Sequence, residues 1–261
     1  MGGPTDDALL DALDEVLRAR LVRETEAPGH LSFSHALVHQ TGYEELGTLR
    51  RAKLHWQIGE AIERRYADVL DEHVSELAHH FGEGAVAGDP LRAVDWSLRA
   101  GTRAASLVAH EEAIAHYRIA LATLDQSGQS APERRYQALM GIGRATNTLG
   151  DYVLARKSLY PAVRLAKAQG WTDRQARATV EAASFYSSGN SLIGSELVEL
   201  IDDTLAALPP GDSRERAMLI ARKGVQSHAG GLQAQVDADA MADEAVDMAA
   251  ARGRRGALQC V

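Results

Sequence analysis

The chain is poor in the residues that make disulfides, metal cages and aromatic cores. Among its 261 residues there is one cysteine, Cys260, which excludes an intrachain disulfide and a zinc site built from cysteines. Phe, Trp and Tyr number 3, 3 and 7, so a core has to be made of Ala, Leu and Val, as in closely packed helices. Proline is scarce too, at 7 residues, and the ordinary hydrophobic content of 45% argues against long disordered segments.

Positive charge is also in deficit, since the formal net charge is −8. Phosphate contacts need clustered Lys and Arg, so direct binding of nucleic acid is not expected. No apolar run approaches the roughly 18 residues that a membrane-spanning helix needs. The acidic, amphipathic start "MGGPTDDALLDALDEVL" is unlike a signal peptide. These features predict a cytoplasmic protein that does not associate with membranes.

Residues 1–48 have the order helix, hairpin, helix. In residues 6–22 the leucines and valines fall on one helical stripe, and the turn signal Ala27-Pro28-Gly29 separates two short apolar runs. A second helix follows, with Ser34 as the expected N-cap. This order predicts a winged-helix-like unit over residues 1–48.

Two further helices are expected between residues 49 and 88, because the apolar spacing there is helical. The glycine-rich stretch "GEGAVAGDP", residues 82–90, has the composition of a linker. Beyond it the pattern is helical throughout and becomes repetitive. We therefore divide the chain into linking helices over 49–88 and a repeat array over 89–261.

The repeat is seen when residues 109–124, "AHEEAIAHYRIALATL", are aligned with residues 151–166, "DYVLARKSLYPAVRLA". Ala113 then falls on Ala155 and Ala120 on Ala162, an offset of 42 residues. A glycine stands twelve residues before the first of these alanines in each unit: Gly101 before Ala113 and Gly143 before Ala155. Paired antiparallel helices with small residues at their contact are typical of tetratricopeptide repeats, whose standard unit has about 34 residues.

The same register continues toward the C-terminus. Thr204 follows Ala162 at 42 residues and Ala245 follows Thr204 at 41, so "AVRLAKAQG" at 162–170 returns as "AVDMAAARG" at 245–253. Coincidence among alanine-rich helices is the alternative. The pattern predicts an all-α fold with one short β-hairpin and a tetratricopeptide-like solenoid. Its last unit looks incomplete, as in a fragment of a longer chain.

Residues 31–81 carry a family motif. Its members here are Phe33, His35, Ala36, Leu37, Val38, Tyr43, Leu46, Arg50, Arg51, Leu54, His55 and Glu76-Leu77-Ala78-His79-His80. This motif resembles the segment that follows the nucleotide-binding domain in bacterial STAND-type ATPases. That group includes ATP-dependent LuxR-type transcriptional regulators and adenylate-cyclase-linked ATPases. The resemblance covers roughly residues 6–125 and is most specific over residues 31–81.

The resemblance implies a signal-transduction ATPase whose winged-helix unit packs on ATP or ADP held by an upstream nucleotide-binding domain. In such proteins a histidine at the start of a winged-helix helix contacts the phosphates, and His35 occupies that place. An imidazole at a helix N-terminus adds a donor where backbone amides already favour an anion. The acidic residue that usually follows is replaced by Ala36. The alternative is that His35 caps or packs the helix.

Catalysis by this chain is not expected. It has no G-x-x-x-x-G-K-[ST] loop and no strand ending in paired acids, so it should neither bind nor hydrolyse ATP alone, and no cofactor is expected in it. The histidine sets, His35 with His39 and His73 with His79 and His80, lack marked third and fourth ligands. In the second set His79 is expected to turn away from the face of the other two. The expectation is therefore no metal site.

A ligand is instead expected on the inner face of the repeats. The repeat register places near that face Arg144, Asn147, Tyr186, Asn190 and Lys223. Such side chains suit a peptide or a small anionic effector, although plain exposure to solvent would produce the same pattern. We interpret the chain as the regulatory, sensor part of a signal-transduction ATPase. The alternative is a free-standing tetratricopeptide-repeat scaffold that binds a protein partner.

Overall fold

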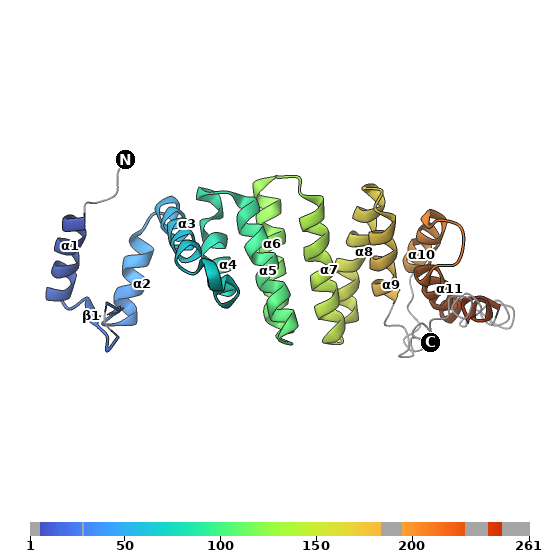
Figure 1. Cartoon of the computed structure of the whole chain (residues 1–261), viewed down its shortest axis with the longest axis horizontal. Helices are drawn as coiled ribbons and strands as arrows, with labels where there is room; N and C mark the ends of the chain where they lie inside the picture. Colours follow the sequence, from blue (N-terminus) through green and yellow to red (C-terminus); the bar gives the residue numbers. More distant parts are fainter. Residues whose placement is uncertain (1–5, 28, 184–194, 228–239, 247–261) are drawn as a thin grey trace.

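The structure is a computed structural model that describes residues 6–27, 29–183, 195–227 and 240–246. Over these residues the fold is all-α apart from one two-stranded antiparallel hairpin, as predicted. The helices stand side by side in an elongated row that runs from the N-terminal to the C-terminal end (Figure 1). Within the described residues no helix has the length and apolar character needed to cross a membrane.

The N-terminal unit has the predicted order. Helix α1 spans Asp6–Arg18, strands β1 and β2 span Val22–Glu24 and Leu31–Phe33, and helix α2 spans Ala36–Glu45. Val22 pairs with Phe33 at the open end of the hairpin. The turn between the strands contains Gly29 with φ +77°, a left-handed conformation that favours glycine.

The expected cap of α2 was wrong by one residue. His35 takes the N-cap position, with extended backbone and no capping bond from its side chain. The Ser34 hydroxyl instead donates to the backbone carbonyl of Arg20 at 2.6 Å. Ser34 thus joins the end of the hairpin to the end of α1, because that carbonyl follows the last turn of α1 and needs a donor.

No core is formed within the N-terminal unit. None of the described side chains between residues 7 and 46 is buried. Large apolar groups are open to solvent, including Leu10 at 61% exposure and Leu37 at 72%. A helix–hairpin–helix segment of this size cannot offset its conformational entropy without apolar burial. Over its described residues, the N-terminal unit therefore leaves its apolar side chains without a core of their own.

The helices after it belong to one continuous array. Helix α3, Thr48–Arg65, and helix α4, Val74–Gly84, are joined by the 3₁₀ segment η1, Ala67–His73. Phe81 of α4 is fully buried, and its ring lies 4.8 Å from that of Trp56 and 6.3 Å from that of Trp96, centroid to centroid. The three rings come from α3, α4 and α5 and join these helices into one core.

The glycine-rich stretch at residues 82–90 is not a free linker. It ends α4 and then forms a short 3₁₀ turn, η2 at Ala85–Ala87, in which Ala85 is buried. Gly84 lies so close to α3 that a Cβ there would meet the backbone nitrogen of Trp56 at 2.7 Å. Glycine occurs here because two helices touch through their backbones, which composition alone does not distinguish from a linker.

The repeat array consists of antiparallel helix pairs, which makes the fold an α-solenoid. The helices are α5 at Pro90–Ser106, α6 at His110–Ser127, α7 at Pro132–Thr148, α8 at Tyr152–Ala168, α9 at Thr172–Ala183, α10 at Ser195–Ala207 and α11 at Arg214–Ser227. Each packs on its sequence neighbours along the row (Figure 1). Residues 240–246 are helical as well.

The 42-residue register is confirmed in the second helix of each pair. Ala113, Ala155 and Leu197 are all buried, as are Ala120, Ala162 and Thr204. Ala245, the next expected position, is buried too. A turn at Gly150, with φ +80°, separates the two helices of this pair, and Asp151 accepts a hydrogen bond from the Leu154 amide at 2.9 Å as the N-cap of α8.

Thr204 explains why the third unit departs from alanine. Its hydroxyl is fully buried and lies 2.9 Å from that of Thr179. The side-chain amide of Gln175 donates to the same hydroxyl at 3.1 Å. A polar contact thus replaces the small apolar contact of the earlier units, and each buried polar group in it has a partner.

The first helix of each pair carries its own mark. The third residue of α5, α7, α9 and α11 is an arginine in every case: Arg92, Arg134, Arg174 and Arg216. The first three pair with acidic residues of the preceding unit, respectively Glu63, Asp95 and Glu133. Arg216 instead donates to carbonyls at the end of α10. Such half-exposed pairs contribute about 0–1 kcal/mol each, so they set register more than stability.

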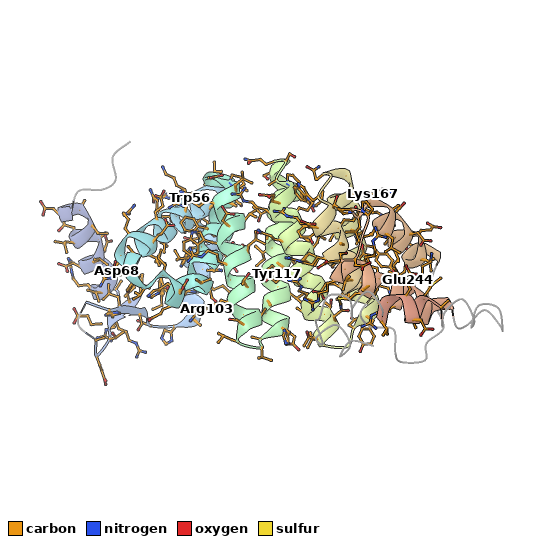
Figure 2. All side chains as sticks on the ribbon, turned by 45° about the vertical axis from the view of Figure 1, so that its right-hand side comes forward. Trp56, Asp68, Arg103, Tyr117, Lys167 and Glu244 are labelled. Carbon is orange, nitrogen blue, oxygen red and sulfur yellow. The ribbon has the colours of Figure 1, made fainter. Side chains whose placement is uncertain are left out.

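The role expected for the repeated glycines needs correction. Gly101 does not face a small residue across the helix pair, because a Cβ on it would lie 2.7 Å from the ring of Tyr117. Gly141 of α7 meets the same ring from the other side, and Gly143 meets Leu159. The glycines therefore make room for large side chains of the second helices. Tyr117 lies in the middle of the array (Figure 2).

Candidate functional site

Two neighbouring cavities open along the first helices of the pairs. The first, of about 510 Å³, lies among α5, α6, α7 and α9. The second, of about 830 Å³, lies between α7, α9, the connection at residues 208–213 and the start of α11. Arg144 and Arg177 line both cavities. Together the two cavities form what we call the inner groove.

The first cavity is aromatic and cationic. Its lining includes Tyr117, Tyr136, Met140 and the guanidinium groups of Arg144 and Arg177, and it contains no carboxylate. The Tyr136 hydroxyl donates to the backbone carbonyl of Arg174 at 2.8 Å. Burial raises the pKa of Tyr136, so this hydroxyl stays protonated at neutral pH. The cavity is therefore suited to an anionic group next to an apolar one.

The second cavity has mixed charge. Its lining carries four acidic residues, Asp173, Glu181, Asp212 and Glu215, together with three arginines, Arg144, Arg177 and Arg214. Arg144 donates to the carboxylate of Glu181 at 2.8 Å and is therefore neutralised there. Arg177 has no carboxylate partner within the described chain. It is the cation that remains available to a ligand where the two cavities meet.

The residues predicted to line the groove occupy different positions in the structure. Arg144 lies in it, half exposed. Asn147 is only 6% exposed, and its amide reaches the backbone carbonyl of Glu181 at 3.4 Å, so it packs α7 on α9. Lys223 lies against α10, where it donates to Asp202 at 2.5 Å, and it does not line either cavity. Tyr186 and Asn190 fall outside the described residues.

Arg177 was not predicted from the sequence, because the number of residues between successive repeats is not constant. Helices α5 and α7 begin 42 residues apart, whereas α7 and α9 begin 40 apart, at Pro132 and Thr172. Carrying Gln137 forward by 42 leads to Thr179, which is buried. The observed step of 40 leads to Arg177, and both Gln137 and Arg177 line the first cavity. The recurrent arginine at the third helical position would have revealed the shorter step.

His35 stands apart from the groove, in the N-terminal unit. Its side chain is exposed and lies at the N-cap of α2, next to the backbone amides that begin the helix. This is the placement expected of a histidine that faces a phosphate. His39, one turn further, instead packs its ring between Phe33 and Tyr43. The two histidines thus differ in role, although sequence spacing puts them on one helix face.

A histidine cluster lies between α3 and α4. The Nδ1 atoms of His55 and His80 are 3.0 Å apart, and the rings of His55 and His79 are 5.4 Å apart. Contrary to expectation, His79 and His80 therefore reach the same partner. His73 is separate, because its ring stacks on Tyr66 at 3.8 Å. The sequence analysis missed His55, whose distance in sequence gave no sign of this contact.

Burial lowers the pKa of both His55 and His80, and the neighbouring imidazoles lower it further. A positive charge on one of these rings would face the other rings of the cluster. The two side chains are consequently neutral at pH 7 and can share a hydrogen bond, one as donor and the other as acceptor. The Tyr43 hydroxyl lies 2.9 Å from Nε2 of His55 and belongs to the same network.

The described fold defines an α-solenoid with an inner groove. No family model matches the chain, and no curated protein matches it. Among solved structures it is similar to BtubC (BKLC) from P. vanneervenii, with a TM-score of 0.53 and 16% identity. The match covers 80% of this chain and 93% of that one. At this identity the likeness shows a shared fold and nothing more.

Proposed function

We propose that the chain is the regulatory, sensor part of a STAND-type signal-transduction ATPase of the LuxR-type regulator group. Its tetratricopeptide-like repeats bind an effector in the inner groove. Its N-terminal unit is winged-helix-like and packs on an upstream nucleotide-binding domain. Effector binding shifts the contact between this unit and ADP or ATP, and so changes the state of the parent protein.

The observation that carries the proposal is the missing core of the N-terminal unit. Residues 7–46 have helices and a hairpin in the predicted order but no buried described side chain. Apolar side chains such as Leu10, Phe33 and Leu37 are at least 49% exposed. Exposed apolar surface of this extent marks a binding face. A domain that supplies the missing core would cover it.

Two further features support this mechanism. His35 is exposed at the start of α2, free of a capping role, which leaves its imidazole available for a phosphate. In the inner groove, Arg177 offers an anionic, partly apolar effector charge pairing, and the apolar lining of the first cavity offers it contact. An acidic peptide has this chemistry.

The test is calorimetric titration with ADP. The chain described here should bind no ADP, because no phosphate loop is present in it. The same chain extended by the preceding part of its reading frame should bind ADP. In that longer protein His35→Ala should weaken binding about tenfold or more, the loss of one charge-assisted hydrogen bond.

His73→Ala is the matched control. His73 lies at the end of η1, where its ring stacks on Tyr66, and not at the start of α2. It should leave ADP affinity unchanged. If the longer protein shows no nucleotide binding, the regulator proposal fails and the chain is a free-standing repeat scaffold. If ADP binds but His35→Ala has no more effect than His73→Ala, the phosphate contact is wrong.

A further inference from the structure

We propose that His55, His79 and His80 form a binding site for a divalent transition-metal ion, with Zn²⁺ as the biological candidate. One nitrogen of each imidazole lies within 4.8 Å of those of the other two. His55 comes from α3, while His79 and His80 are consecutive residues of α4. Three imidazoles are a ligand set that Zn²⁺, Cu²⁺, Ni²⁺ and Co²⁺ all accept.

The spacing is close to what a metal requires. With Zn–N bonds of about 2.0–2.1 Å, two nitrogens of a tetrahedral site lie about 3.3 Å apart. The Nδ1 atoms of His55 and His80 are already 3.0 Å apart. His79 is exposed and can turn its ring inward, since no neighbouring side chain encloses it. Binding therefore needs rotation of one side chain and no movement of the helices.

Tyr43 supplies the outer contact that such sites need. Its hydroxyl lies 2.9 Å from Nε2 of His55, on the opposite side of the ring from the shared Nδ1. When Nε2–H donates to this hydroxyl, Nδ1 keeps its lone pair and points at His80. Metal-ligating histidines nearly always donate their second ring nitrogen in this way, which fixes the tautomer and orients the ring.

The surroundings carry a net negative charge, which suits a cation, and leave an open side. The carboxylate of Glu83 and the guanidinium of Arg51 interact electrostatically with His55, and the carboxylate of Glu76 interacts in the same way with His80. Arg51 is itself engaged with the Tyr43 ring, 4.8 Å from its centroid. With three protein ligands and one exposed side, water would complete the coordination shell. The ion would enter past His79.

The site would tie together two parts of the chain. Tyr43 belongs to α2, in the unit that has no core, whereas the three histidines belong to the solenoid. A metal that orders His55 strengthens its bond to Tyr43 and so fixes α2 against α3. This inference does not depend on the proposed function, because it requires no nucleotide and no upstream domain.

The experiment is titration of the tag-free chain with Co²⁺, followed by visible absorption, and with Zn²⁺, followed by calorimetry. We expect one ion per chain and the intense absorption bands of four-coordinate Co²⁺, which Zn²⁺ displaces. His79→Ala and His80→Ala should each lower affinity about 100-fold or more. Tyr43→Phe should lower it about tenfold, the usual effect of losing an outer contact.

His73→Ala is again the control, since His73 lies just before α4 but outside the cluster. It should leave both the Co²⁺ spectrum and the Zn²⁺ affinity unchanged. Circular dichroism of each variant checks that the helices remain, and His79→Ala changes an exposed side chain. Absence of four-coordinate Co²⁺ bands in the parent chain would overturn the proposal. So would bands that persist in His79→Ala and His80→Ala.

Discussion

Gly141→Ala should destabilise the solenoid by about 1–3 kcal/mol, the usual result of overpacking a core. An added Cβ on Gly141 would overlap the ring of Tyr117. The ring cannot move away, because Gly101 flanks its other side so closely that an added Cβ there would lie 2.7 Å from the ring. In an open helix the same change gains about 0.5–1 kcal/mol, so the predicted sign is reversed. Urea unfolding followed by circular dichroism measures the effect.

Gly82→Ala provides the matched control. Gly82 is also helical, but a Cβ on it would come no closer than 3.6 Å, to Ile119. This variant should be as stable as the parent or slightly more stable. If Gly141→Ala behaves in the same way, α5, α6 and α7 do not clamp the Tyr117 ring. In that case the Tyr117 ring is also not fixed in the wall of the first cavity.

Phe81→Ala should have the largest effect of a single truncation, about 3–5 kcal/mol. The side chain is fully buried and contacts the rings of Trp56 and Trp96. The guanidinium carbon of Arg92 lies over the Phe81 ring, 4.7 Å from the centroid of that ring. Because these partners belong to α3 and α5 while Phe81 belongs to α4, the loss should lower the unfolding midpoint of the whole array. The midpoint is followed by circular dichroism in urea.

Phe33→Ala tests the contrast between buried and exposed phenylalanine. Phe33 is 49% exposed on β2, so its truncation should cost no more than about 0.5 kcal/mol. A separate early transition in Phe81→Ala, with the repeats unfolding as in the parent, would contradict the account. It would mean that α3 and α4 fold apart from α5 and that residues 82–90 do act as a linker.

The fold could be predicted because its signals are local. Helical stripes and the turn at Gly29 each depend on a few neighbouring residues. The recurrence of Ala120 at Ala162 and Thr204 then fixed the order of the pairs. The turn glycine was predicted correctly, but the glycines at Gly84 and Gly101 were not, because composition does not show which atoms a glycine packs against. Gly84 and Gly101 both proved to be close contacts.

The groove could be predicted only in part, because it depends on repeat length. A step shortened by two residues between α7 and α9 moves every inward position of α9. Arg144 precedes that change and lines both cavities, whereas Arg177 follows it and was missed. The histidine cluster was missed for another reason. His55 and His80 are 25 residues apart and meet only through the packing of α3 on α4.

The central claim is that the N-terminal unit obtains its core from another domain. Amide hydrogen exchange of residues 6–46 tests it most directly, in this chain alone and in the chain extended upstream with ADP bound. Residues 90–183 serve as an internal reference, since their helices have buried cores.

We expect exchange over residues 6–46 to be fast in the chain alone and slowed by orders of magnitude in the longer, ADP-bound protein. Residues 90–183 should be protected equally in both. Protection of residues 6–46 in the chain alone, to the level of the repeats, would contradict the account. Equal and fast exchange in both proteins would contradict it as well.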